Sequence, residues 1–319
     1  DAVTAVTYAD ININLSDIGL VTGGEFIGFN INVEDTFMII GSEFTAVDNI
    51  DVNANAIADA SFFANTVDVA ADVIDGGSIR AQAVTFDELT AGNEIQVGTD
   101  AAVKVMSADT ITVENGGVVN IVSENSNDTT FTVAASDDVT LAQTGGDMIA
   151  AVVTDKDATL TADADIEGSV EAKKLSATAE NVTLATTVRE LRADVVDTIE
   201  ITETDDLEID KVVAGKEASI KAGGDIADSE DDAIADIIAP VVVLESTGGS
   251  IGGTDNSLDI DAQELSAVAK YLINLNNLSA LDVLVTKLSA ADSIDYLASG
   301  NGSTTFEDVL AGTINLDAS

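Results

Sequence analysis

The chain has 319 residues and is strongly acidic, with 12 Lys and Arg residues against 58 Asp and Glu residues and a formal net charge of -46. Such a charge makes nucleic acid and anionic membranes poor partners, because the long-range interaction is repulsive, and a hydrophobic fraction of 46% excludes a disordered acidic tail. The chain also lacks Cys and His, so disulfides are absent and the commonest general base and metal ligand is missing, which favours a protein that is not an enzyme.

Residues 1–48 form the first distinct segment. Six of the nine Phe residues fall between Phe26 and Phe63, and residues 11–15 alternate between apolar and polar side chains. We expect this segment to cap a solenoid or to pair with a neighbouring subunit, because the terminal coils of a solenoid must be covered. The alternative is an ordinary first coil with a bulkier core.

Residues 49–262 consist of short segments in which apolar and polar residues alternate, separated by Asp, Asn, Glu and Gly. A period of two is typical of strands with one buried face. Without helical connections, such strands must bury that face against their neighbours in sequence. The pattern therefore predicts an all-β fold, a parallel β-helix or β-solenoid with short turns, in which either end carries an atypical coil or an amphipathic helix. An antiparallel sandwich is the alternative, because turns such as Asn115-Gly116-Gly117 also close hairpins.

A tripeptide recurs along the chain: a large apolar residue, then Ser or Thr, then Ala. In a strand its first and third side chains lie on one face and the hydroxyl lies on the other, so stacked copies would fill a narrow core. The copies begin at Phe44, Leu89, Met106, Leu160, Leu175, Leu265, Leu278 and Leu288.

Residues 248–269, GGSIGGTDNSLDIDAQELSAVA, resemble the repeat of secreted filamentous-haemagglutinin-type proteins. In that repeat a Gly-rich phrase with Ile-Gly precedes a short strand and then a Leu-Ser/Thr-Ala strand. Residues 223–234 resemble it more weakly, and no counterpart of the amino-terminal secretion domain of that family is visible. The resemblance implies a right-handed parallel β-helix on a secreted or surface-held fibre.

Residues 263–319 are predicted to form carboxy-terminal coils or a cap. The spacing of Leu265, Val268 and Leu272 also fits one amphipathic helix. Strands are favoured, because the Asn residues at 274–277 interrupt the helical face and the tripeptide returns at Leu278.

Acidic clusters are the only candidate sites for chemistry. Calcium takes six to eight oxygen ligands, often from carboxylates on a turn, so the loop at residues 225–232 is the best candidate for a calcium site. No other cofactor is indicated, and the alternative is a solvated acidic loop. The candidate calcium ligands are Asp225, Asp228, Asp231 and Asp232. Two further acidic clusters contain Asp205, Asp206, Glu208 and Asp210, and Asp255, Asp259 and Asp261.

The chain begins at Asp1 without a leader, as in a processed chain or a piece of a longer one. It also lacks the ~20-residue apolar run of a transmembrane segment. We predict a non-enzymatic extracellular or cell-surface protein, a solenoid subunit that associates head to tail into a filament. One alternative is an adhesin stalk that binds a host or carbohydrate surface. Another is a polysaccharide-acting β-helix enzyme, for which no catalytic residue stands out.

Overall fold

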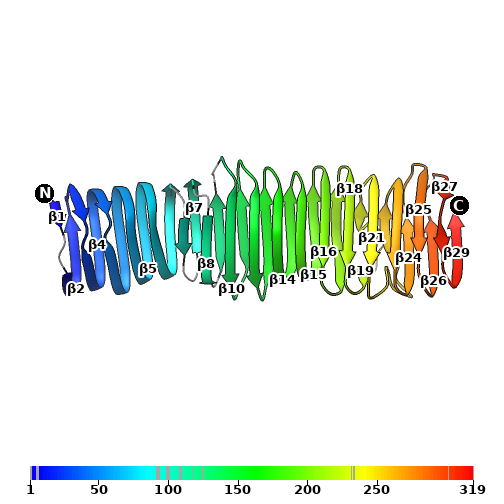
Figure 1. Cartoon of the computed structure of the whole chain (residues 1–319), viewed down its shortest axis with the longest axis horizontal. Helices are drawn as coiled ribbons and strands as arrows, with labels where there is room; N and C mark the ends of the chain where they lie inside the picture. Colours follow the sequence, from blue (N-terminus) through cyan, green and yellow to red (C-terminus); the bar gives the residue numbers. More distant parts are fainter. Residues whose placement is uncertain are drawn as a thin grey trace. The chain divides into compact units, whose positions relative to one another are not determined.

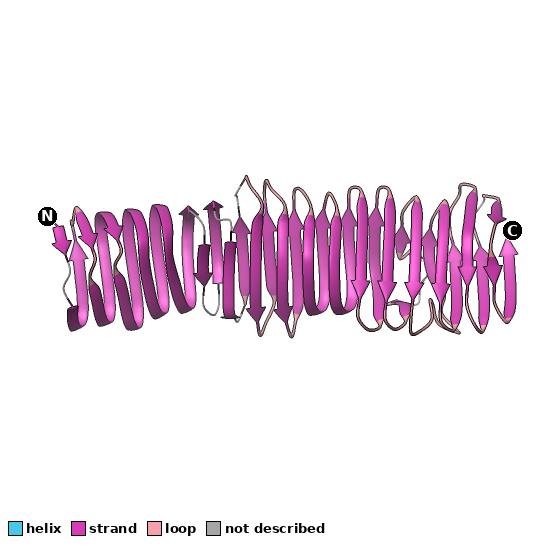
Figure 2. Ribbon diagram, viewed as in Figure 1, coloured by secondary structure: helices cyan, strands magenta, loops and turns pink. Residues whose placement is uncertain are grey.

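The computed structural model describes residues 2–4, 7–90, 94–97, 101–107, 110–116, 118–123, 126–230, 232, 234–300 and 302–318. Every element in these residues is a β-strand, and the strands pair in parallel to form a β-solenoid of about 13 turns. The described residues contain no helix (Figure 2), and therefore none that could cross a membrane. The predicted all-β, parallel solenoid is confirmed, and the antiparallel alternative is wrong.

The strands divide between two compact units. The amino-terminal unit comprises Asp1–Lys156 and Ala162–Ala164, and the carboxy-terminal unit comprises Asp157–Thr161 and Asp165–Ser319.

The amino-terminal unit contains the strands that Figure 1 colours from blue to green. Thr7 pairs with Glu25 and Glu25 pairs with Glu43, so these successive coils have the same length. The strands are β1 (Ala2–Thr4), β2 (Thr7–Ser16), β3 (Leu20–Thr22), β4 (Glu25–Ile40), β5 (Glu43–Thr90), β6 (Glu94–Val97), β7 (Ala101–Ser107), β8 (Thr110–Gly116), β9 (Val119–Ser123), β10 (Thr129–Ala135), β11 (Val139–Gln143) and β12 (Met148–Thr154).

An aromatic stack lies in the core of the amino-terminal unit. Phe26, Phe44 and Phe62 come from successive coils, and each is at most 1% exposed. Their ring centroids lie 4.8 and 5.1 Å apart, with interplanar angles of 9° and 10°. The stack forms because an in-register parallel ladder places the same position of each coil opposite its counterpart, as it does for Phe26 and Phe44.

The carboxy-terminal unit contains the strands that Figure 1 colours from green to red. Its coils differ in length: Ile166 pairs with Val182, whereas Glu217 pairs with Val241, which makes the later coil the longer one. The strands are β13 (Asp157–Ala162), β14 (Ile166–Ala179), β15 (Val182–Val195), β16 (Thr198–Glu203), β17 (Leu207–Ala214), β18 (Glu217–Ala222), β19 (Ile226–Asp228), β20 (Ile237–Ile238), β21 (Val241–Ser246), β22 (Leu258–Asp261), β23 (Glu264–Ala269), β24 (Leu272–Asn277), β25 (Val283–Ser289), β26 (Ser293–Ala298), β27 (Thr304–Phe306), β28 (Val309–Leu310) and β29 (Thr313–Ala318).

Aliphatic columns fill the core of the carboxy-terminal unit. Alternate residues of each strand point inward, and the register stacks them coil on coil, so the unit has one continuous core. One column, in which no residue is more than 1% exposed, contains Ile166, Val182, Ile199, Ala218, Val242, Leu265 and Val285.

The Gly-Gly turns stack so closely that side chains are excluded. A Cβ atom at Gly248 would lie 2.2 Å from the carbonyl oxygen of Gly223, and one at Gly223 would lie 1.9 Å from that of Thr204. The repeated Gly-rich phrase around residues 223 and 248 is thus explained by three turns in close contact.

The recurring tripeptide has the predicted orientation at most of the positions whose side chains are described. At Leu175 and Leu265, for example, the large residue and the Ala are buried and the Ser is partly exposed. At Leu278 the prediction is wrong: Ser279 is 3% exposed while Leu278 is partly exposed. A turn held by the hydrogen bond from Ser279 N to Asn277 Oδ1, at 3.1 Å, causes the change.

The carboxy-terminal residues form strands rather than the alternative helix. β23, β24 and β25 replace the helical pattern considered for the residues after 262. The division into two units does not test the predicted segment boundaries at residues 48 and 262. The segments 1–48, 49–262 and 263–319 therefore stay a prediction.

Candidate functional site

Acidic and amide side chains in the turns bind the backbone of the next coil. Asp206 Oδ1 accepts a hydrogen bond from Asp225 N at 2.8 Å, and Asp225 Oδ1 accepts one from Ser250 N at 2.6 Å. Asp282 Oδ1 likewise accepts from Ser303 N at 3.1 Å and from Ser303 Oγ at 2.7 Å, and these bonds lower the pKa of Asp282. Part of the chain's acidity therefore serves to hold successive turns together.

In the turn predicted to bind calcium, two of the carboxylates accept hydrogen bonds from the backbone of the turn itself. Asp228 Oδ1 accepts from Glu230 N at 2.7 Å, and Asp232 Oδ1 accepts from Ile234 N at 2.7 Å. Asp225 Oδ1 accepts the hydrogen bond from Ser250 N on the next coil. Asp231 lies outside the described residues. No group of three or more acidic side chains in the described part of the chain is arranged to hold a metal ion. The calcium site stays a prediction.

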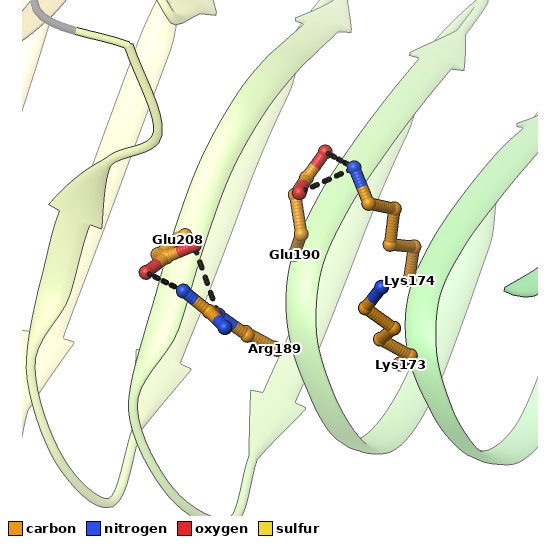
Figure 3. A pocket seen from close by; sticks show the side chains of 5 residues that line it. All are labelled: Lys173, Lys174, Arg189, Glu190 and Glu208. Atoms are coloured by element: carbon orange, nitrogen blue, oxygen red, sulfur yellow. Dashed lines mark hydrogen bonds and ion pairs between the residues drawn. The ribbon is translucent and has the colours of Figure 1, made fainter. Parts of the chain in front are cut away.

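A recess with several cations lies at one corner of the carboxy-terminal unit (Figure 3). Strand alternation breaks on β14, where two consecutive residues, Lys173 and Lys174, both point outward between buried neighbours. The same break occurs on β15 at Arg189 and Glu190, and β17 adds Glu208. Together these five side chains line a recess of about 240 Å³.

Ion pairs across this corner tie each coil to the next. Lys174 Nζ lies 2.7 Å from both carboxylate oxygens of Glu190, and this hydrogen-bonded partner raises the pKa of Lys174. Arg189 binds Glu208 through Nε and Nη2, each at 3.3 Å. Further inter-coil pairs in this unit are Arg192 with Asp210, Lys216 with Asp197, and Lys221 with Glu245.

The charges that line the recess nearly cancel one another. Lys174 and Arg189 are each neutralised by a carboxylate from the following coil, which leaves Lys173 without an ion pair among the described residues. The five charges sum to one positive charge on a chain of net charge -46. Because exposed ion pairs contribute little to stability, the ion pairs at this corner add only slightly to the stability of the unit.

Replacing Lys174 with Met is expected to lower the free energy of unfolding of the carboxy-terminal unit slightly in dilute buffer, and this difference should vanish in 1 M NaCl. Urea unfolding at low and high salt measures both values. The matched control is Lys173→Met, which removes an unpaired cation and should leave stability unchanged. A loss that persists in 1 M NaCl would contradict an electrostatic origin, because Met keeps an apolar stem of similar length and removes only the charge.

Sequence reasoning missed two buried acids, Glu203 and Asp236. Glu203 is 3% exposed and Asp236 is 5% exposed. The sequence pattern could have indicated the burial of both residues. Glu203 occupies an inward position of its alternating strand, and Asp236 interrupts the apolar run from Ile234 to Ile238. Both serve as acceptors for backbone N–H groups.

No protein-family description matches this sequence, and no curated protein or solved structure is significantly similar to it. The chain's own residues are therefore the basis for the function proposed below.

Proposed function

We propose that this chain is a non-enzymatic structural protein of the cell exterior, a β-solenoid subunit that assembles end to end into a surface fibre. The observation that carries the proposal is the parallel ladder between successive coils, which could continue from β29 into a further coil. Within the described residues β29 is paired on one side only, with β26 from Ser293 to Ala298 (Figure 1). Its other edge presents backbone N–H and C=O groups that a further parallel strand would satisfy.

Apolar side chains on this last coil support the same proposal. Ile314 is 46% exposed and Leu316 is 38% exposed, whereas their register partners Ile294 and Tyr296 are 0% and 2% exposed. Leu310 of β28 is 66% exposed. One more coil stacked on β29 would bury these side chains, as β29 itself covers Ile294 and Tyr296.

The geometry of such a contact favours a fibre. The surface of a solenoid's last coil differs from that of its first, so contact between two copies is heterologous, and a heterologous contact that does not close produces filaments. The resemblance of residues 248–269 to the repeat of filamentous-haemagglutinin-type proteins supports a secreted or surface-held fibre as the setting.

Assembly is tested by sedimentation velocity of the purified chain over a range of concentrations. The wild-type protein should shift from its monomer mass of 32.6 kDa to larger species as concentration rises. The double variant Ile314→Asp with Leu316→Asp should stay monomeric, because it places two charges on the apolar edge. The control is Val196→Asp with Val153→Asp, two sites that are 69% and 49% exposed and belong to much earlier coils than β29. A wild-type protein that stays monomeric throughout, or a control that dissociates equally, would contradict the proposal.

Assembly should also strengthen with salt. Subunits of net charge -46 repel one another, and the Debye length falls from ~10 Å at 0.1 M to ~3 Å at 1 M ionic strength. We expect larger species in 1 M than in 0.1 M NaCl at equal protein concentration. The opposite order would mean that charge attraction, rather than apolar burial and backbone pairing, joins the subunits.

A further inference from the structure

Two carboxylates from neighbouring coils of the carboxy-terminal unit are buried next to each other. Asp236, just before β20, is 5% exposed, and Asp259 of β22 is 3% exposed. Asp236 N donates to the carbonyl oxygen of Asp259 at 2.8 Å, and Asp259 N donates to Asp236 Oδ2 at 2.9 Å. Asp259 Oδ1 accepts from Ser257 Oγ at 3.0 Å and from Asn276 Nδ2 at 3.1 Å. The side chain of Asp236 thus joins the two coils by accepting a hydrogen bond from the backbone of Asp259.

The charges that act on Asp236 are negative. They belong to Asp228 of β19, Asp232 of the following turn and Asp259. Hydrogen bonds hold two of them in place: Asp228 Oδ2 accepts from Asn256 Nδ2 at 3.1 Å, and Asp232 Oδ1 accepts from Ile234 N at 2.7 Å. The other ionisable residues on the elements around Asp236 are Glu208, Asp210 and Lys211 of β17, Glu230 of the turn and Asp261 of β22.

Burial is the main influence on the ionisation of this pair. It raises the pKa of Asp236 from 3.8 to about 8, and the three neighbouring carboxylates add to the rise, while the hydrogen bond from Asp259 N opposes it. Burial also raises the pKa of Asp259. At neutral pH Asp236 therefore keeps its proton, which avoids a second charge in a site with little contact with water.

We propose that Asp236 and Asp259 form a pH-sensitive latch, which holds the two coils together while Asp236 is protonated and loosens them once that proton is lost. The protonated carboxyl still accepts the hydrogen bond from Asp259 N through one oxygen. The ionised carboxylate would carry its charge in a buried site, across the contact from the negative charge of Asp259, which weakens the contact. The latch is a property of this coil itself and does not depend on assembly into a fibre.

The direction of the pH effect follows from proton linkage. When the coil opens locally, Asp236 regains the ordinary carboxyl pKa of 3.8, so between pH 3.8 and about 8 the open state releases a proton that the closed state keeps. The closed state is therefore most favoured in acid, and its advantage falls as pH rises. The equilibrium constant for opening should increase roughly tenfold per pH unit in this window and level off above about pH 8.

Amide hydrogen exchange of the whole chain tests the latch. The amides of Asp236 and Asp259 report on the contact, because each donates a hydrogen bond across it. After correction for intrinsic exchange, their protection relative to β14 and β15 amides should fall roughly 100-fold between pH 5 and pH 7. Asp236→Asn, which keeps the acceptor oxygen without the proton, should abolish this dependence. The control Asp261→Asn, on the same strand as Asp259, should retain it.

The proposal is overturned if the relative protection is constant from pH 5 to pH 8, or if Asp236→Asn behaves like the wild type. Should Asp236→Asn not fold, carbon-13 NMR of the wild-type Asp236 carboxyl decides instead. A titration midpoint near 8 supports the latch, and a midpoint near the ordinary carboxyl value refutes it.

Discussion

Replacing Phe44 with alanine is expected to lower the free energy of unfolding of the amino-terminal unit by about 3–5 kcal/mol. The Phe44 ring is fully buried and stacks between Phe26 and Phe62, at centroid distances of 4.8 and 5.1 Å. Truncation removes its burial, leaves a cavity and breaks two ring contacts. The gap cannot close easily, because backbone hydrogen bonds fix the spacing of neighbouring strands at ~4.8 Å.

Urea unfolding followed by circular dichroism measures this loss, and amide exchange of β4 and β5 shows where it occurs. The matched control is Phe29→Ala, since Phe29 lies on β4 and is 46% exposed; its cost should be below about 1 kcal/mol. Equal costs for the two variants would mean that the stacked rings do not form the core of this unit.

Replacing Glu203 with alanine is expected to destabilise the carboxy-terminal unit by about 1–3 kcal/mol. Its buried carboxylate accepts three backbone hydrogen bonds. Oε2 accepts from Val188 N at 2.9 Å, and Oε1 accepts from Thr204 N at 2.8 Å and Asp205 N at 3.1 Å. Alanine would leave the buried Val188 N–H unpaired, at a cost of ~1–3 kcal/mol. Thr204 N would keep its hydrogen bond to the carbonyl oxygen of Thr186 at 3.0 Å, and Asp205 lies in an exposed turn.

A graded series separates this role from simple loss of charge. Glu203→Gln keeps one acceptor oxygen and should cost about half as much as Glu203→Ala. Glu200→Ala removes an exposed carboxylate from the same strand, β16, and should cost less than about 0.5 kcal/mol. If Glu203→Gln were as damaging as Glu203→Ala, the negative charge rather than the acceptor geometry would be the important feature.

Much of the fold could be predicted from local pattern. The period of two indicated the strands, because each strand of a solenoid has one face in the core and one in water. The position of Leu265 and Ala267 in the core follows from the recurring tripeptide. The aromatic stack was also present in the sequence, since Phe26, Phe44 and Phe62 are evenly spaced, and their spacing equals the length of the coils at that end.

The contacts between coils could not be predicted in the same way. They depend on which residues share a register, and the coil that follows Glu217 is longer than the one that follows Ile166. Asp225 therefore looked like a free carboxylate suited to a metal ion, whereas its oxygen binds the backbone of Ser250 on the next coil. The burial of Asp236 likewise depends on neighbouring coils that no local pattern specifies.

The parallel stacking of successive coils is tested most directly by disulfide formation between introduced cysteines, because the chain contains no Cys. Two double variants are required, Glu200→Cys with Ser219→Cys and Thr202→Cys with Lys221→Cys, which are register partners on β16 and β18. Parallel strands keep both pairs within the Cα separation of about 4.4–6.8 Å that a disulfide needs.

An antiparallel pair that placed residue 200 opposite residue 219 would place residue 202 opposite residue 217, about 13 Å along the strand from residue 221. Peptide mapping without reductant identifies the cross-links. Disulfide formation in both variants is the predicted result, and formation in only one of them would contradict the parallel solenoid.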